Sequence, residues 1–281
     1  MITVQEVPPL RAFVRRARVE GKSIGFVPTM GALHEGHLSL VRLARDESAC
    51  VVVSVFVNPL QFGPAEDFSR YPRRPEKDAA LLTAAGASLL YLPRPEEFYP
   101  SDFSTSVEVH GVSEGGEGAV RPAHFRGVAT VVSRLFLQVA PDTAFFGRKD
   151  LQQVAVVRRL IRDLDFPIRL VAGQTVREPD GLALSSRNVY LTPDERERAP
   201  ALSRALFAAR QRARTGVRDA AILVGEARAE LARSGLAIDY VEVVDETTMR
   251  AAASVDRGTA MTAAVRLGKT RLIDNVALLD D

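Results

Sequence analysis

The sequence predicts an α/β protein with a doubly wound, Rossmann-like parallel sheet and a smaller C-terminal α+β domain. Short apolar, β-prone runs alternate with segments of helical period through the first two thirds of the chain. One run, CVVVSVFV (50–57), is apolar throughout, which is typical of a parallel strand covered on both faces. After about residue 177 this alternation stops. We therefore expect two domains, 1–176 and 177–281.

Hydrophobic period and the positions of Gly and Pro give the expected elements in order. In the first domain we expect strands at 24–27, 50–57, 88–92, 143–146 and 168–176, and helices from Glu35 onward and at 75–85, 128–139 and 151–164. The second domain should contain helices 193–213 and 218–233, strand 238–244, and a hairpin of 260–266 and 271–277 that turns at Gly268 and Lys269.

Two segments lead to more specific expectations. On the helix from Glu35, Leu38, Val41 and Leu43 or Ala44 should face inward. Residues 93–122 are rich in Pro, Gly, Ser and acidic residues, and we expect a long excursion with one short strand at 105–109.

Composition fits a globular enzyme better than a nucleic-acid-binding module. Among 281 residues, 46% are apolar, which suffices for a sizeable core. The net charge is only +2, and the arginines alternate with acidic residues instead of forming blocks. The single cysteine, Cys50, lies in an apolar run and is expected to be a buried strand residue rather than a reactive thiol. Without a signal-like leader or an apolar run near 18 residues, the expected location is cytoplasmic, with no membrane partner.

The segment IGFVPTMGALHEGHLSLV (24–41) joins a buried strand to a helix through a turn with two glycines and two histidines. At such a junction the first helical N–H groups are unpaired and the helix dipole is positive, so the turn suits phosphate oxygens. His34 and His37 are three residues apart and can point at the same polyphosphate. Two alternatives remain open at this point: surface or helix-capping histidines, and a Zn²⁺ site.

The same segment resembles the H-x-G-H signature of the pantothenate synthetase (pantoate–β-alanine ligase) family. H-x-G-H alone is shared with nucleotidylyltransferases and class I aminoacyl-tRNA synthetases. Further blocks resemble the family in the family's own order, and they cover nearly the whole chain: VFVNPLQFG (55–63), HFRGVATVV (124–132), FFGRKDLQQ (145–153), REPDGLALSSRN (177–188) and GKTRLIDN (268–275). Because the histidine segment and the first four of these further blocks start at or just after expected strand ends, we expect these five to converge on one crevice.

The resemblance implies an AMP-forming ligase that uses ATP and Mg²⁺ to convert pantoate to pantoyl adenylate, which β-alanine then attacks. It implies a homodimer and no nucleic-acid partner. The residues implied to be catalytic are His34, His37, Lys149 and Arg187. Those implied to bind ATP are Met30, Gly31, Ala32, Leu33, His34, Glu35, Gly36, His37, Gly147, Arg148, Lys149, Asp150, Val176, Leu184, Ser185, Ser186 and Arg187.

The chemistry of these side chains suits the implied roles. Lys149 would meet the triphosphate as a point charge, and Asp150 could bind the nucleotide or help to hold Mg²⁺. Ser185, Ser186 and Arg187 would form a second phosphate clamp. The uncharged amides of Gln61 and Gln153 suit the hydroxyls and carboxylate of pantoate. Taken singly, each residue also has a structural interpretation, as a surface cation, a loop amide or a helix cap.

Some positions depart from the family pattern or stay open. Arg148 stands where relatives often have Glu or Gln, and Lys77 beside Asp78 puts a paired-carboxylate metal site there in doubt. The role of His124 is open. Two other functions remain candidates: a nucleotidylyltransferase, which predicts cations in place of Gln61 and Gln153, and a non-catalytic interaction module, which needs a basic face with exposed aromatics.

Overall fold

The computed structural model describes residues 1–64 and 66–280, which fold into two compact units. The first unit comprises Met1–Val109, Pro122–Arg148 and Val156–Gln174, and the second comprises His110–Arg121, Lys149–Ala155 and Thr175–Asp281. The second unit thus takes two short segments from the earlier part of the chain. The domain limits 1–176 and 177–281 stay a prediction.

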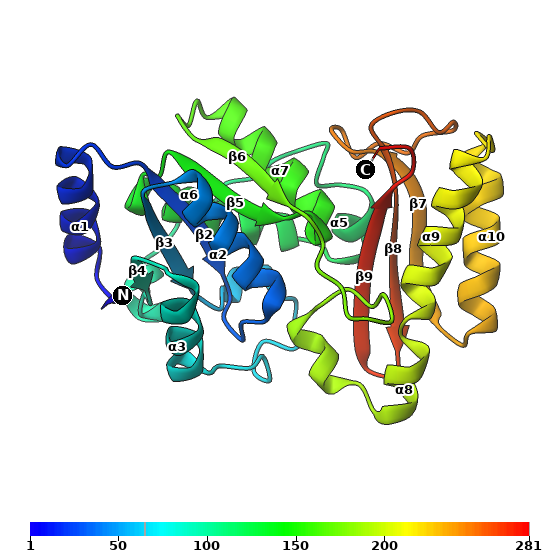
Figure 1. Ribbon diagram of the computed structural model, residues 1–281, viewed down its shortest axis with the longest axis horizontal. Coiled ribbons are helices and arrows are strands. Elements are labelled where there is room, and N and C mark those ends of the chain that lie inside the picture. The colour runs from blue at the N-terminus through cyan, green and yellow to red at the C-terminus, as the bar shows by residue number, and fades with distance from the viewer. Residues whose placement is uncertain (65, 281) are drawn as a thin grey trace. The chain divides into compact units, whose positions relative to one another are not determined.

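The first unit contains a six-stranded parallel sheet in the order β1-β4-β3-β2-β5-β6 (Figure 1). This confirms the expected doubly wound parallel sheet. Its strands are β1 (Ile2–Val4), β2 (Ile24–Thr29), β3 (Cys50–Val55), β4 (Leu89–Tyr91), β5 (Thr143–Gly147) and β6 (Arg169–Gly173). Its helices are α1 (Val7–Val19), α2 (Glu35–Glu47), α3 (Pro75–Ala85), α4 (Pro95–Phe98) and α6 (His124–Val139); the helical turn η1 (Pro59–Gln61) follows β3, and α7 (Leu151–Asp163) runs from the second unit into the first.

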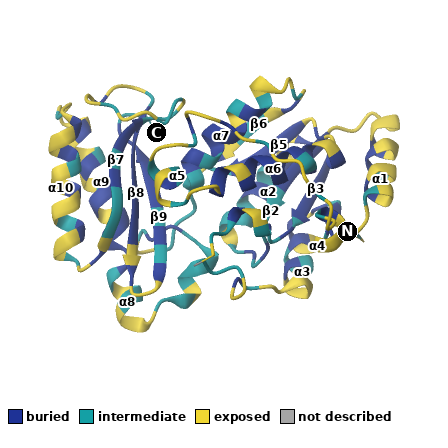
Figure 2. Ribbon diagram, turned by 180° about the vertical axis from the view of Figure 1, so that it is seen from behind, coloured by how far each residue is buried: buried dark blue, intermediate teal, exposed yellow. Residues whose placement is uncertain are grey.

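Helices cover both faces of this sheet, which explains its continuous apolar strands. Val27 packs in a cluster with residues of α2 and α3, whereas its neighbour Phe26 meets Phe136 of α6, with ring centroids 6.4 Å apart. Successive strand residues point to opposite faces, so α2 and α3 lie on one side and α6 on the other. Figure 2 shows the central strands as buried.

Several local expectations in the first unit are wrong. No strand forms at 105–109, because the Val107 N–H donates to Thr130 Oγ1 on α6 (3.0 Å) instead of to a strand. The excursion contains α4 and, in the second unit, α5 (Gly116–Val120). The block at 124–132 begins α6 and does not follow a strand. On α2 the buried residues are Leu40, Val41 and Ala44, while Leu38 and Leu43 are half-buried.

The second unit contains the smaller α+β fold that the sequence predicts. An antiparallel sheet in the order β7-β8-β9 packs against two helices. Its elements are α8 (Pro193–Arg198), α9 (Ala201–Arg214), α10 (Ala220–Arg233), β7 (Ala237–Asp245), β8 (Thr259–Leu267) and β9 (Thr270–Ala277). The single helix expected at 193–213 is two helices, because Pro200 has no N–H to donate and its ring disturbs the preceding turn. No helix in the described parts of the chain is long and apolar enough to cross a membrane.

Gly127 lets α6 approach η1, the turn that carries Gln61. A Cβ at position 127 would lie 2.6 Å from Gln61 N and would also meet the Leu60 carbonyl group. These are backbone atoms, so the two segments would have to separate. Gly225 on α10 is the opposite case, since a Cβ there would have nothing within 4 Å.

We therefore expect opposite effects from two glycine substitutions. Gly127→Ala should lower the free energy of unfolding by about 1–3 kcal/mol through overpacking. Gly225→Ala, the matched control, should raise it by about 0.5–1 kcal/mol because alanine is the better helix former. Urea unfolding of both variants measures this difference. A gain in stability from Gly127→Ala would contradict the close contact between α6 and η1.

Candidate functional site

The polar residues of the first unit gather beside the point where the sheet changes its winding direction. From β2 the chain order runs outward through β3 and β4, while β5 and β6 lie on the other side of β2. Ligands of doubly wound sheets bind beyond the carboxyl ends of the strands at such a switch point. The histidine turn follows the carboxyl end of β2, and Gly147 and Arg148 lie at the carboxyl end of β5.

His34 and His37 are held side by side, with ring centroids 4.1 Å apart. His34 is the N-cap of α2: its Nδ1 accepts a hydrogen bond from Gly36 N (3.2 Å), and His37 Nδ1 accepts one from His34 N (3.3 Å). His34 therefore caps α2, as one of the two alternatives from the sequence predicts. Capping does not exclude the phosphate role, because an Nδ1 that accepts puts the proton of a neutral ring on Nε2. In their neutral form both rings would carry an Nε2–H donor, and both lie at the positive end of a 13-residue helix.

Asp78 of α3 binds the backbone of this turn, a role that the sequence analysis did not predict. Its carboxylate, 1% exposed, accepts hydrogen bonds from Ala32 N (3.0 Å) and Leu33 N (2.9 Å). Gly31, with φ +81°, leaves room for it, since a Cβ there would lie 2.9 Å from Asp78 Oδ2. Asp78 therefore serves the backbone of the turn and forms no paired-carboxylate site with its neighbour. The sequence does contain a signal for this role. Asp78 lies four and seven residues before Leu82 and Ala85, so it is an acid on the buried face of α3.

A chain of hydrogen bonds orients the amide of Gln61. Burial raises the pKa of Tyr99 well above its usual range, so its phenol stays protonated and donates to Asn58 Oδ1 (3.1 Å). Asn58 Nδ2 donates to Gln61 Oε1 (3.0 Å), and Gln61 Nε2 lies 3.0 Å from Met30 Sδ. Met30 and Gln61 are thus brought together. Asn58 lies in the same sequence block as Gln61, but nothing in the sequence distinguished it.

His124 contacts the same turn from α6. It is buried, and its Nδ1 lies 2.8 Å from the carbonyl oxygen of Gln61. The ring therefore holds the backbone that carries Gln61.

The second unit carries the other predicted phosphate-binding residues. The Lys149 side chain is 19% exposed, with Nζ 4.0 Å from Asp150 Oδ1. Both residues belong to the helical turn η2 (Arg148–Asp150), just before α7, which carries Gln153. A carboxylate beside substrate phosphates is the arrangement that Mg²⁺ usually takes, so the half-buried Asp150 fits this metal. Within 1–64 and 66–280, no three His, Cys, Asp or Glu side chains are grouped so that they could hold a metal ion.

Residues 176–187 form a compact hairpin in this unit. Leu184 N donates to Val176 O (3.0 Å), and Arg177 pairs with Ala183 in an antiparallel bridge. Ser185 then caps the helical turn η3 (Ser186–Tyr190) by accepting from Arg187 N (3.2 Å). The helix-cap interpretation therefore holds for the Ser185 hydroxyl, and the hairpin fixes the backbone on which Ser186 and Arg187 lie.

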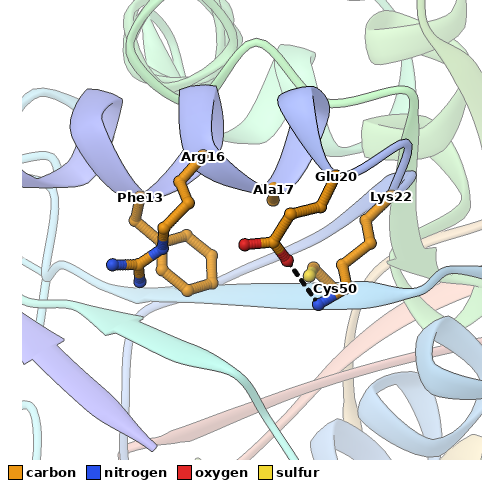
Figure 3. A pocket seen from close by; sticks show the side chains of 6 residues that line it. All are labelled: Phe13, Arg16, Ala17, Glu20, Lys22 and Cys50. Carbon is orange, nitrogen blue, oxygen red and sulfur yellow. Dashed lines mark hydrogen bonds and ion pairs between the residues drawn. The ribbon is translucent and has the colours of Figure 1, made fainter.

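A separate cavity of about 260 Å³ lies at the opposite end of the parallel sheet (Figure 3). Lys22 just precedes β2 and Cys50 begins β3, so this cavity is at the amino ends of the strands. Two of the lining residues are paired, since Lys22 Nζ donates to Glu20 Oε2 (2.7 Å), and Cys50 is 7% exposed. The expectation that Cys50 is a buried strand residue is confirmed. The lining residues are Phe13, Arg16, Ala17, Glu20, Lys22 and Cys50.

Comparison with known proteins identifies the family. Residues 2–277 match the family model described as pantoate-beta-alanine ligase. A pantothenate synthetase from Acidiphilium cryptum is 54% identical over 280 residues, covering 99% of this chain and all of the relative. The crystal structure of pantothenate synthetase from Thermus thermophilus superimposes over both full chains with a TM-score of 0.95 at 50% identity. A Francisella tularensis pantoate-beta-alanine ligase, complexed with beta-gamma ATP and beta-alanine, has a TM-score of 0.82 at 30% identity, with 99% and 98% of the chains covered. The chain therefore belongs to the pantoate–β-alanine ligase family.

Proposed function

We propose that this chain condenses pantoate with β-alanine in an ATP-dependent reaction that proceeds through pantoyl adenylate. In the first step a pantoate carboxylate oxygen attacks the α-phosphorus of ATP and pyrophosphate leaves. In the second step the β-alanine amine attacks the acyl carbon, releasing AMP and giving the amide pantothenate. The observation that carries this proposal is the turn at 30–37, where two imidazoles stand at a helix N-terminus beside the sheet's switch point. The Francisella relative, whose complex contains an ATP compound and β-alanine, supports it.

The protein's main contribution would be positioning and electrostatic stabilisation. Negative charge shifts to the leaving pyrophosphate during the first step, and fixed donors aimed at that charge lower the barrier. The Nε2–H groups of His34 and His37 are such donors, and His37 is the candidate proton donor to the leaving group. Because both rings are held through Nδ1, their direction needs no reorganisation during the reaction.

The remaining candidate phosphate contacts belong to residues of the second unit. Lys149, Ser185, Ser186 and Arg187 would bind the triphosphate and Val176 would lie against the adenine. Asp150 would hold Mg²⁺ together with the phosphates, and the metal would supply neutralisation of phosphate charge.

The environment of Gln61 bears on substrate choice. Two uncharged side chains, Asn58 and Met30, contact its amide, and Tyr99 holds Asn58 in place. A nucleotidylyltransferase that accepts a phosphorylated substrate would need cations here, so this pocket favours a hydroxyl-bearing acid without a phosphate group, such as pantoate. Gln153 would bind pantoate in the same way. The homodimer, which the resemblance implies, and the cytoplasmic location stay predictions.

The products test the reaction directly. Pantoate should support exchange of labelled pyrophosphate into ATP without β-alanine, and the complete reaction should release AMP. Release of ADP and phosphate would instead indicate an acyl phosphate intermediate and would overturn the proposal.

We expect His37→Ala to lower turnover by roughly 10²- to 10⁴-fold, the usual contribution of a positioned acid or base. The control is His110→Ala, since the His110 side chain is 78% exposed. Steady-state turnover of the two variants, with circular dichroism to verify folding, measures the effect. A loss below about threefold in folded His37→Ala would reduce this residue to a structural role.

Asp78→Asn keeps the size of the side chain but should weaken the hydrogen bonds that hold the histidine turn. One amide oxygen can still accept, but the new NH₂ group faces a backbone N–H, which costs about 1–3 kcal/mol. We expect kcat/KM for ATP to fall by about tenfold. Asp46→Asn, at an exposed acid on α2, makes the same change in charge and should leave kcat/KM unaltered. Equal effects of the two substitutions would show that charge, and not the turn, is responsible.

Substitutions of Gln153 and Arg187 should separate pantoate binding from ATP use. Gln153→Ala would leave a polar group of bound pantoate underpaired, costing about 1–3 kcal/mol, or a roughly tenfold to hundredfold higher KM for pantoate. Arg187→Ala should instead impair adenylate formation. Steady-state kinetics with pantoate and ATP varied in turn distinguish the two. If Gln153→Ala chiefly raises KM for ATP, its assignment to the pantoate pocket is wrong.

A further inference from the structure

The block GKTRLIDN (268–275) belongs to the family pattern, yet no role in the reaction has been given to it. It forms the β8–β9 turn and most of β9, and its last two residues, Asp274 and Asn275, are both buried. Because successive strand residues point to opposite faces, these neighbours serve opposite sides of the sheet. Asp274 lies on the face of Leu272 and Val276, which pack in the core of this unit. Asn275 lies on the other face.

Asp274 holds the hairpin that leads to Ser185. Its carboxylate makes a bidentate ion pair with Arg177, with oxygen–nitrogen distances of 2.6 and 2.9 Å, and its side chain is 1% exposed. Arg177 Nη1 also donates to Gly181 O (3.1 Å), and its guanidinium lies 4.8 Å from the ring centre of Phe207. A bidentate pair fixes the relative orientation of its two side chains. Removing either partner would leave an uncompensated buried charge.

Asn275 holds the segment that carries Lys149. Its Nδ2 donates to the carbonyl oxygen of Lys149 (2.8 Å). Its backbone is tied to the neighbouring ion pair, since Asn275 N donates to Asp274 Oδ1 (2.8 Å). Two consecutive residues of one strand therefore fix both backbone segments that bear the predicted phosphate-binding side chains of this unit.

We propose that Asp274 and Asn275 are positioning residues for adenylate formation, which set the spacing between Lys149 and the Ser185–Arg187 segment so that both meet one triphosphate. The inference rests on the proposed function of those side chains. Neither Asp274 nor Asn275 needs to touch the substrate. Substituting either residue should therefore slow adenylate formation, in which charge shifts to the leaving pyrophosphate. It should slow the attack of the amine on the finished adenylate much less.

Asn275→Ala tests this by comparing the two half-reactions. We expect pantoate-dependent ATP–pyrophosphate exchange to fall by about tenfold to hundredfold, because small misplacements of charged groups are costly. Conversion of supplied pantoyl adenylate and β-alanine to pantothenate should stay within about threefold of the unsubstituted protein. Asn275→Gln, which keeps the donor, should recover part of the exchange. Asp274→Asn should behave like Asn275→Ala.

The control is Thr259→Ala, which removes a buried side-chain donor to Asp256 O (2.6 Å) in the same sheet. It should lower thermal stability while leaving both half-reactions within about threefold. If Asn275→Ala lowers both half-reactions by one common factor, or leaves exchange intact, the positioning role is overturned. Should Asp274→Asn fail to fold, the two Asn275 variants decide the question.

Lys149→Ala and Arg187→Ala in the same assays separate this inference from the proposed function. If both retain exchange, the phosphate role of those side chains fails, and the positioning role fails with it. If both lose exchange while the Asp274 and Asn275 variants retain it, only the positioning role is wrong.

Discussion

The two hydrogen bonds from the turn after β2 to the buried carboxylate of Asp78 are the interaction on which the first half of the site depends. Leu33 is buried, so its N–H would be an unpaired buried polar group just before α2 without this acceptor. With it, the turn has one geometry, and both imidazoles are directed by backbone donors to their Nδ1 atoms. The direction of each Nε2–H thus follows from backbone structure.

The second unit uses buried carboxylates in a similar way, but with arginine partners. Glu117 on α5 accepts from Arg271 (2.6 and 2.9 Å), Arg121 (3.1 Å) and Tyr240 (3.2 Å), which ties the segment 110–121 to β7 and β9. Gln152 adds hydrogen bonds to the same segment. Charged pairs of this kind are costly to bury. When both carboxylate oxygens are hydrogen-bonded, they favour one arrangement of the segments that carry them. They explain how segments distant in sequence are held to one sheet.

Most elements of regular structure follow from local patterns. The apolar run at 50–57 predicts a strand buried on both faces, and helix 75–85 is found with the expected limits. Expectations were wrong where nonlocal contacts or a single proline overrode the pattern. Val107 is paired with a threonine side chain on α6, and Pro200 interrupts an otherwise continuous helical period. The first strand and helix were not anticipated at all.

The motifs and their order resemble those of the ligase family, and the comparisons confirm that family. The nucleotide-binding turn stays a prediction, based on the strand-to-helix junction with its glycines and histidines. The sequence by itself did not reveal Asp78, Asn58, Tyr99 or the Asp274–Asn275 pair as parts of the site's support. Their partners lie far away along the chain: Asp78 is 46 residues from Ala32, and Asn275 is 126 from Lys149. Hydrogen bonds depend on distance and angle in space, so only the tertiary structure could decide which buried polar groups meet.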